Sequence, residues 1–312
     1  MAQFTKRLIE VYGRTDGSAV SIPVVDFGRG EKKVFIGVSV HGNEITGQGS
    51  VWQLMDLLKT QELGCAVRIV NVINPEGVNT NERGIPYRDG DINRLYPGDS
   101  KGSTGERLAS KVWELAKEYE CVIDVHTAGN CMPHILLDPL PEPLRTKTHD
   151  VCWASGVTVI EEFPEEEYNK RRLSASLGAV AAKAGKISAT LELAGSGNID
   201  WVNANAGFAA LSNMLVKLDV LSQGCSRVVS GVPVVNERSL HREILRTDHA
   251  GFIQYSVEPG SRVEKGGRVG VVRSVYGEIV GDVVASTECY VIGVNRSHAV
   301  FEGDAVCSIA LK

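Results

Sequence analysis

The chain has 312 residues, of which 43% are hydrophobic and 23% are charged, and its formal net charge is −5. This length and composition are typical of a soluble globular protein with one large domain or two unequal ones. Lysines and arginines are scattered rather than gathered into a run, which disfavours a broad basic surface, so we expect no nucleic-acid partner.

The sequence also argues against a membrane protein and against a disulfide-rich protein. No uninterrupted apolar stretch approaches the roughly 18 residues of a membrane span, and residues 1–14 lack the apolar core of a signal peptide. We therefore expect a cytoplasmic protein without a membrane partner. The 7 cysteines contain no C-x-x-C pair, which argues against a disulfide framework and a thiolate zinc site.

The predicted secondary structure begins with a hairpin that adds edge strands before residue 32. From about residue 32 to 221, short β-branched runs alternate with helical patterns. The predicted strands cover residues 34–40, 67–73, 121–125, 134–137, 157–160 and 187–193, and the predicted helices cover residues 48–59, 105–119, 142–154, 173–184 and 201–221. Because most of these strands are continuous apolar runs, we predict an α/β fold with a mostly parallel sheet flanked by helices.

A candidate metal site follows the strand predicted at residues 34–40. His41 and Glu44 lie three residues apart in the sequence HGNE, so their side chains point the same way in a turn. His126 follows another strand, and parallel strands end at one edge of a sheet. Each feature alone is more often structural than functional. Together they match the ligands of a catalytic zinc site, and we predict that His41, Glu44 and His126 bind one Zn²⁺ per chain.

Glu192 lies among apolar residues near the end of the last predicted α/β strand. Such a carboxylate can serve as a helix cap or as an ion-pair partner. Beside a zinc site it can instead accept the proton of an attacking water and pass it to a leaving amine. Partial burial would help to move its pKa towards the working pH. We therefore predict that Glu192 is the general base.

The segment at residues 74–99 directly follows the strand predicted at residues 67–73, but it is poor in apolar residues and rich in turn formers. Loops of this length inside a compact domain are usually functional or disordered. Arg83, Arg88, Asn93 and Arg94 supply donors suited to an anion. The segment therefore predicts a substrate-binding loop, with a plain solvated loop as the alternative.

After about residue 227 the pattern changes to short strands separated by glycine-containing turns. We predict an α/β domain over residues 1–226 and a small all-β, barrel-like domain over residues 227–312. Two similar strand–turn units, at residues 251–272 and 291–310, resemble biotinyl or lipoyl carrier domains. No lysine occurs between Lys265 and Lys312, so the lysine that a carrier needs is missing and a carrier function is disfavoured.

Several motifs resemble those of the succinylglutamate desuccinylase and aspartoacylase family of zinc amidohydrolases, which is related to zinc carboxypeptidases. They occur in the family's order and cover most of the first 200 residues. The motifs are HGNE at residues 41–44, NPEG at 74–77, the arginine of NERG at 81–84, DINRLYPG at 91–98, DVHTAG at 124–129 and LELAGSG at 191–197.

The resemblance implies a zinc-carboxypeptidase-like fold and a role for each matching residue. His41, Glu44 and His126 match the family's zinc ligands, and Glu192 matches its catalytic glutamate. A C-terminal β domain in this family is expected to shield the mouth of the site or to mediate assembly, for example as a homo-oligomer.

The same resemblance assigns the polar residues of the loop. Asn93 and Arg94 match the pair that binds the substrate's carboxylate, and a planar guanidinium suits that group. Arg83 matches the arginine that stabilises the carbonyl oxygen, and Arg88 is a rival for that role. The motif at residues 91–98 departs from the family by an isoleucine and a tyrosine where leucine and phenylalanine are expected, and the family's mobile substrate-contacting tyrosine has no evident counterpart.

These observations predict a zinc-dependent amidohydrolase that acts on a small N-acylated amino acid or a related metabolite. One alternative is a zinc carboxypeptidase that cleaves short peptides. Another is a non-catalytic relative that binds a metal or a metabolite. The complete ligand set together with Glu192 argues against the second alternative.

Overall fold

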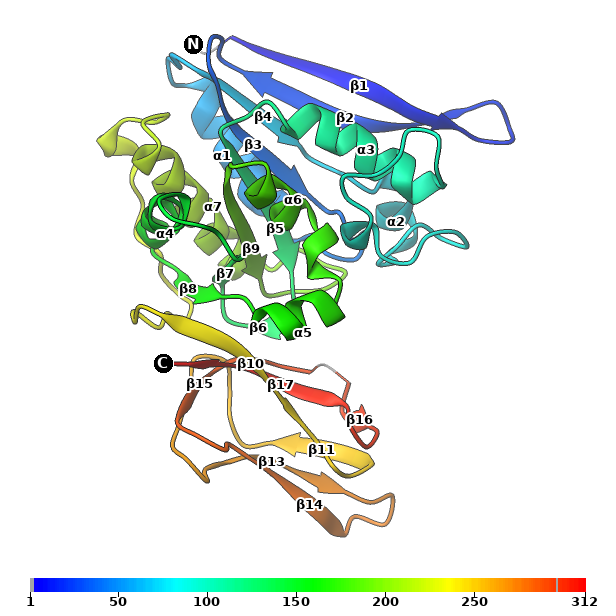
Figure 1. Ribbon diagram of the computed structural model, residues 1–312, viewed down its shortest axis with the longest axis vertical. Helices are drawn as coiled ribbons and strands as arrows, with labels where there is room; N and C mark the ends of the chain where they lie inside the picture. The colour runs from blue at the N-terminus through cyan, green and yellow to red at the C-terminus, as the bar shows by residue number, and fades with distance from the viewer. Residues whose placement is uncertain (1–2, 296) are drawn as a thin grey trace.

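The computed structural model describes residues 3–295 and 297–312. It contains a 13-stranded mixed sheet, flanked by helices over much of its width, and a 4-stranded antiparallel sheet near the C-terminus (Figure 1). The predicted fold class, a mixed sheet flanked by helices with an additional C-terminal β region, is therefore confirmed. Antiparallel pairings nevertheless outnumber parallel ones in the large sheet, because the N-terminal hairpin and the C-terminal strands pair antiparallel.

The elements up to residue 225 alternate between strands and helices. The strands are β1 (Phe4–Gly13), β2 (Ala19–Phe27), β3 (Lys32–Val38), β4 (Ala66–Val70), β5 (Cys121–Thr127), β6 (Asn130–Cys131), β7 (His134–Leu137), β8 (Thr158–Glu161) and β9 (Ile187–Leu193). The helices are α1 (Thr46–Lys59), α2 (Pro75–Thr80), α3 (Thr104–Ala116), α4 (Leu144–Ala154), α5 (Glu165–Lys170), α6 (Leu177–Lys183) and α7 (Trp201–Lys217), with short 3₁₀ turns η1 (Ile92–Arg94), η2 (Leu173–Ala175) and η3 (Gln223–Cys225).

The remaining elements are all strands. They are β10 (Leu240–Arg246), β11 (Gly251–Tyr255), β12 (Arg262–Val263), β13 (Arg268–Arg273), β14 (Ile279–Val284), β15 (Cys289–Val294), β16 (Ala299–Val300) and β17 (Ala305–Leu311). The large sheet runs in the order β1-β2-β4-β3-β5-β9-β7-β8-β10-β17-β15-β12, with β6 paired to β15, and the small sheet runs β14-β13-β11-β16.

The centre of the large sheet is parallel. β3 pairs in parallel with β4 and β5, and β5 pairs in parallel with β9. β7 runs antiparallel to β9 but parallel to β8. The carboxyl ends of β3, β5 and β9 therefore meet at one edge of the sheet, where ligand sites of parallel sheets are found.

Both faces of the central sheet are covered by helices, which explains why its strands are apolar throughout. Buried residues of α1, α4 and α7 form one core with one face of the strands, and those of α3 and α6 form a second core with the other face. Successive residues of β5 alternate between these two cores: Ile123 joins the first and Val122 joins the second. The same alternation decides which side chains of β5 and β9 reach the pocket.

The N-terminal hairpin predicted before residue 32 is confirmed. β1 and β2 pair antiparallel, and β2 also pairs with β4, so β1 is an edge strand of the large sheet. The exposed residue Leu8 lies on this edge strand. The hairpin therefore widens the sheet on the side away from the C-terminal strands (Figure 1).

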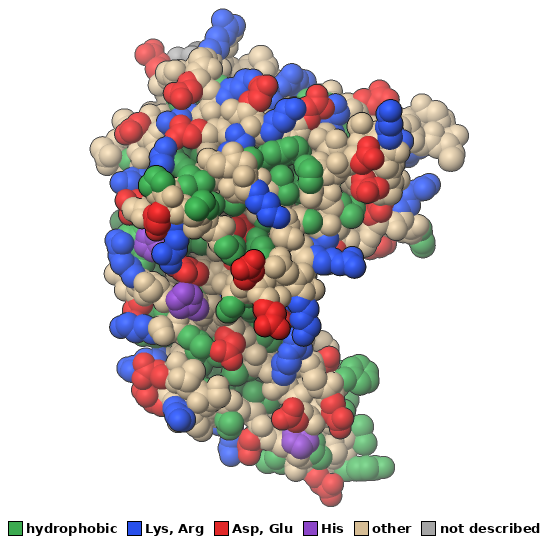
Figure 2. All heavy atoms as spheres, in the orientation of Figure 1, with side chains coloured by type: hydrophobic (Ala, Val, Ile, Leu, Met, Phe, Trp, Pro, Cys, Tyr) green, Lys and Arg blue, Asp and Glu red, His purple; other side chains and the backbone are tan. Residues whose placement is uncertain are grey.

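The C-terminal strands continue the large sheet rather than standing apart from it. β10 pairs in parallel with β8, with Leu240 opposite Ile160, and then antiparallel with β17. A small core containing Met132, Ile160, Leu240 and Ile292 joins the two regions. The domain boundary placed at residue 226 stays a prediction. Figure 2 shows a hollow beside this junction, with acidic and basic side chains along its rim.

Most of the predicted elements exist, with ends shifted by a few residues. The prediction missed α2 and α5, which have 6 residues each and are too short to display a helical period. It also merged η2 and α6 into one helix across Ser176, whose side chain caps α6 by accepting a hydrogen bond from Ala179 N. Among the described residues, none of the helices is long and apolar enough to cross a membrane.

Candidate active site

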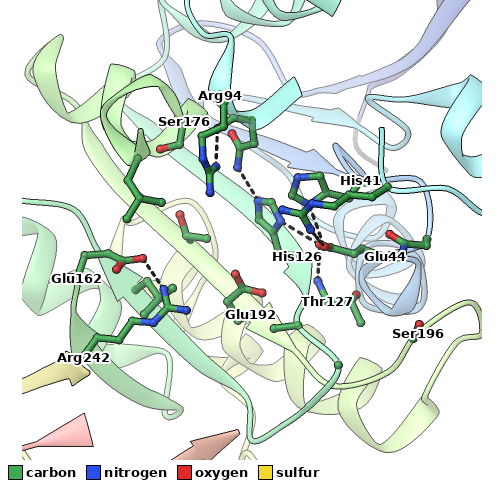
Figure 3. A pocket seen from close by; sticks show the side chains of 18 of the residues that line it. His41, Glu44, Arg94, His126, Thr127, Glu162, Ser176, Glu192, Ser196 and Arg242 are labelled. Carbon is green, nitrogen blue, oxygen red and sulfur yellow. Dashed lines mark hydrogen bonds and ion pairs between the residues drawn. The ribbon is translucent and has the colours of Figure 1, made fainter. Parts of the chain in front are cut away.

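A cavity of about 480 Å³ lies at the carboxyl edge of the central strands. Its walls come from the loop after β3, from residues 83–94, from β5 and β9, and from the C-terminal region. Figure 3 shows His41, Glu44 and His126 gathered on one side, Glu162 and Arg242 on the opposite side, and Glu192 between them. We call these two sides the metal end and the distal end of the pocket.

Three buried side chains converge at the metal end. His41 Nδ1 lies 2.8 Å from Glu44 Oε1, and His126 Nδ1 lies 3.0 Å from Glu44 Oε2. One ligand atom from each residue lies within 4.8 Å of the others. The structure thus brings together the three residues that the sequence predicted as metal ligands.

The outer nitrogen of each histidine faces a further carboxylate. His41 Nε2 lies 2.9 Å from Asp91 Oδ1, and His126 Nε2 lies 2.8 Å from Asp124 Oδ2. Both nitrogens of each ring thus face a carboxylate, and if Nδ1 bound a metal ion, Nε2 would carry the hydrogen and donate it to Asp91 or Asp124. Carboxylate partners of this kind orient the histidine ligands of metal ions.

The chemistry of these facing groups indicates whether the cluster fits a metal ion. Each Nδ1 faces a Glu44 carboxylate oxygen, an arrangement that suits a positive charge between them, carried by a proton or by a metal ion. His41 Nδ1 is buried and has no hydrogen-bond partner among the described residues. Two imidazoles and one carboxylate are also a typical ligand set of catalytic zinc. The cluster therefore fits a metal ion such as zinc.

The electrostatics of the cluster agree with this fit. Burial opposes ionisation of Glu44, but contacts with His126 and His41 outweigh it and hold the pKa of Glu44 well below its usual range. For His126, burial favours the neutral ring, whereas Asp124 and Glu44 raise its pKa well above the ordinary value. A metal ion bound at the cluster would therefore compete with the proton of His126.

Local backbone structure positions His41 and Glu44. The loop after β3 turns through Ser39, which has a positive φ of 56°. Gly42 packs directly on the first turn of α2, where a Cβ would come within 1.9 Å of the Gly77 backbone. Asn74 caps that helix by accepting a hydrogen bond from Gly77 N. Neither Gly42 nor Gly77 has room for a side chain, so the HGNE and NPEG segments can pack directly against each other.

The predicted loop at residues 74–99 reaches the pocket through Arg83 and η1. Arg83 donates hydrogen bonds to Glu44 Oε1 at 2.8 Å and to Asp91 Oδ2 at 3.0 Å. Asp91 caps η1 by accepting from Asn93 N and at the same time holds His41. The segment is therefore ordered around the cluster and is more than a solvated loop.

Asn93 and Arg94 both line the pocket, but their side chains have different hydrogen-bond partners within the protein. The Asn93 amide donates to Asp124 and accepts from Leu177 N, so its side chain is engaged within the protein. The Arg94 guanidinium donates to the carbonyl oxygens of Asn93 and Arg171 and remains partly exposed. The structure does not bring Arg88 to this pocket, since Arg88 lines a separate cavity with Tyr12 and other residues.

Glu192 lies on β9 directly opposite His126 of β5 in the parallel register. Burial raises its pKa, with Glu44 adding to the shift and His126 opposing it. Glu192 therefore lines the pocket beside the cluster of His41, Glu44 and His126.

The sequence analysis missed several residues of the pocket. Asp91 and Asp124 fall inside quoted motifs, and the spacing of Asp124 and His126 on one strand could have indicated a shared face. Asp138, Glu162 and Arg242 had no such signal. Arg242 lies on β10 and donates a hydrogen bond to Glu162 Oε1 at 2.8 Å, a contact that joins the C-terminal region to the pocket.

The fold and the cluster define a class of α/β proteins with two histidines and one glutamate at the carboxyl edge of the sheet. The sequence profile of the succinylglutamate desuccinylase/aspartoacylase catalytic domain matches residues 31–218. The chain belongs to this family, whose members are amide-bond hydrolases.

One curated relative is an N-alpha-acetyl-L-2,4-diaminobutyric acid deacetylase from Halomonas elongata. It is 23% identical over 263 residues, which cover 80% of this chain and 72% of the relative. The relative's name describes a deacetylase of an N-acetylated amino acid.

Solved structures support the same fold. An aspartoacylase family protein from Mesorhizobium loti has a TM-score of 0.81 and 22% identity, with 99% of this chain and 95% of that chain covered. A succinylglutamate desuccinylase from Silicibacter sp. TM1040 has a TM-score of 0.82 and 20% identity, with 99% and 94% covered. The product-bound ectoine utilization protein EutE (DoeB) from Ruegeria pomeroyi has a TM-score of 0.80 and 19% identity, with 99% and 95% covered.

Proposed function

We propose that this protein is a zinc-dependent amidohydrolase that removes the acyl group from a small N-acylated amino acid. The observation that carries the proposal is the convergence of His41, Glu44 and His126 beside Glu192 in one pocket. Membership of a family of amide-bond hydrolases supports the reaction type.

His41, Glu44 and His126 would hold the metal ion through Nδ1, a carboxylate oxygen and Nδ1. When bound, zinc supplies Lewis-acid polarisation of the scissile carbonyl and makes water more acidic. Asp91 and Asp124 would then accept hydrogen bonds from Nε2 of His41 and His126 and so hold both imidazoles with Nδ1 towards the ion.

Glu192 would accept a proton from the attacking water and later deliver it to the leaving amine. Its carboxylate suits both steps because burial raises its pKa and so increases its affinity for the proton. The proton therefore moves from water to Glu192, and then from Glu192 to the amine nitrogen as the carbon–nitrogen bond breaks.

Arg83 and Arg94 would bind the negative charges of the substrate. Arg83 lies beside the cluster, where its guanidinium can stabilise the charge that develops on the carbonyl oxygen. Arg94 lines the pocket with a partly exposed guanidinium suited to the carboxylate of the amino acid. Asn93 orients Asp124 from its buried position, and its direct contact with substrate stays a prediction.

The C-terminal region narrows the pocket and so favours small substrates over peptides. Arg242 of β10, Val294 of β15 and the adjacent Asn295 contribute to its wall. A peptide needs an open groove, whereas this cavity of about 480 Å³ has a size suited to a small molecule.

The test is amine release from N-acetyl and N-succinyl amino acids and from short peptides, with zinc-loaded and chelator-treated protein. Chelator-sensitive release from an N-acyl amino acid, restored by zinc, is expected. Release from peptides alone would favour a carboxypeptidase. A zinc-loaded protein that releases no amine from any of these compounds would contradict the proposed reaction.

A further inference from the structure

Strand β1 leaves one side of the large sheet open. It is the terminal strand in the sheet order, and among the described residues only β2 pairs with it. Figure 1 shows β1 along the margin of the molecule. With 10 residues, β1 is at the upper end of usual strand lengths. An edge strand presents backbone N–H and C=O groups that can pair with a further strand.

The pairing of β2 with its two neighbours shows which residues of β1 point their backbone groups outward. Pro23 of β2 points its carbonyl oxygen towards β4, because it accepts a hydrogen bond at 3.3 Å from the N–H of Asn71, which directly follows β4. Leu8 of β1 lies opposite Pro23. This pair therefore exchanges no hydrogen bond, and the N–H and C=O groups of Leu8 point away from β2.

The start of the strand agrees with this assignment. Gln3 O accepts a hydrogen bond from Gly28 N at 3.0 Å, so the carbonyl of Gln3 points towards β2. The register between β1 and β2 is regular from Phe4 to Glu10. Because the backbone groups of successive residues point to opposite edges of a strand, the odd-numbered residues of this stretch face β2 and the even-numbered residues face outward.

The outward-facing residues carry side chains that are arranged symmetrically about Leu8. Lys6 precedes Leu8 by two residues and Glu10 follows it by two, and all three side chains are exposed, Leu8 at 74%. Within the described part of the chain, neither Lys6 nor Glu10 takes part in a salt bridge, whereas Arg7 pairs with Asp26 at 2.8 Å. The strand thus carries a cation and an anion at equal distances from an exposed apolar side chain.

This symmetry makes β1 complementary to a second copy of itself. In an antiparallel pair with Leu8 opposite Leu8, Lys6 of each copy lies opposite Glu10 of the other, and the two leucine side chains meet at the axis. Centring the pair on Lys6, Arg7 or Glu10 would instead place like charges opposite each other. Lysines on an edge strand usually discourage pairing, but in the register centred on Leu8 the charges attract.

We propose that β1 pairs antiparallel with β1 of a second copy of this chain, with Leu8 on the two-fold axis. Lys6, Leu8 and Glu10 then exchange backbone hydrogen bonds with the second copy, and the two large sheets become continuous. No described residue of β1 lines the pocket, so both pockets stay open in this dimer. The inference is therefore independent of the proposed function.

Sedimentation equilibrium of the full chain measures the assembly. We expect a reversible dimer with a Kd in the micromolar range, because a strand pair buries less area than a standard interface. Lys6→Glu and Glu10→Lys should each weaken the dimer by about 3- to 30-fold, since both symmetric contacts change from attraction to repulsion. The double variant Lys6→Glu/Glu10→Lys should restore the affinity to within about threefold.

Lys265→Glu is the matched control, because Lys265 is exposed between β12 and β13 and undergoes the same charge change. It should leave the Kd within about twofold. Thermal unfolding of every variant checks that the fold is intact.

A crosslink tests the position of the axis. Cα atoms of a hydrogen-bonded antiparallel pair lie about 5.5 Å apart, which is within the range that a disulfide bridges. Leu8→Cys should therefore form a covalent dimer on mild oxidation, whereas Lys265→Cys and the unchanged protein should not. A protein that stays monomeric, a dimer that both single charge variants leave intact, or a double variant that does not recover would overturn the inference.

Discussion

At the metal end of the pocket each histidine has a carboxylate partner, whereas at the distal end Asp138 has a buried oxygen without any partner among the described residues. Asp91 and Asp124 fix how His41 and His126 point. Among the described residues, no side chain holds a hydrogen-bond donor against Asp138 Oδ2 in the same way.

The difference follows from what each end is expected to hold. A metal ion stays bound, so its ligands benefit from a rigid second layer of hydrogen bonds. No resident ion is proposed for the distal end, and the buried Asp138 oxygen without a hydrogen bond costs stability there. Four predictions test this contrast.

The largest effect is expected at the metal end, from Glu192→Gln. The amide cannot take up the proton of the attacking water, so kcat should fall by about 100- to 10,000-fold. Zinc content, measured by mass spectrometry, should not change because Glu192 is not one of the three predicted ligands. Near-normal turnover in a fully zinc-loaded variant would exclude Glu192 as the base.

Arg83→Ala should have the next largest effect, because it would remove the donor that we propose for the carbonyl oxygen. The expected loss in kcat is about 100- to 1,000-fold. Zinc affinity must be measured in parallel, since Arg83 also donates to Glu44. A greater loss of kcat in Arg88→Ala than in Arg83→Ala would reverse the assignment of this role.

Asp124→Asn should weaken zinc binding by about 10- to 100-fold, because His126 loses the carboxylate that orients its ring. Competition with a chromogenic chelator measures the affinity. Asp91→Asn, the equivalent change behind His41, should act in the same direction. Unchanged affinity in both variants would mean that the two carboxylates serve only the fold.

The smallest effect concerns stability at the distal end. Burial, with a further contribution from Glu162 and Asp124, raises the pKa of Asp138 from 3.8 to about 7, although the Tyr168 hydroxyl opposes the shift. A carboxyl with a raised pKa in the folded state destabilises the fold as the pH rises from about 4 through 7, because the unfolded chain ionises first.

Asp138→Asn removes this penalty. We expect it to raise the free energy of unfolding by about 1–2 kcal/mol at pH 8, with a smaller gain at pH 5, as measured by urea denaturation. A loss of stability at pH 8 would instead mean that Asp138 holds the fold together through Tyr168.

Much of the metal end could be predicted from the sequence because its ligands follow apolar strands. A strand that is buried on both faces is recognisable from its composition alone, and the residue that follows it lies at the edge of the sheet. His41 and Glu44 are close in sequence, and His126 ends a second strand of this kind. Their convergence in the structure agrees with that argument.

The distal end could not be predicted in this way. Asp138 follows β7, which runs antiparallel to β9. Arg242 belongs to β10, in a region whose sequence pattern predicts a separate β domain. The pairing of β10 with β8 brings Arg242 to Glu162. No local pattern in either segment indicates that pairing.

The sequence by itself thus determined the α/β class, the N-terminal hairpin, most of the strands and the three residues that converge at the metal end, because periodicity and short motifs are properties of neighbouring residues. Only the tertiary structure decided that the C-terminal strands extend the main sheet, that Arg88 lies away from the pocket, and that Asp138 Oδ2 has no hydrogen-bond partner among the described residues. Those outcomes depend on which distant segments pack together, and the balance of burial and hydrogen bonding that selects such packing is distributed over the whole chain.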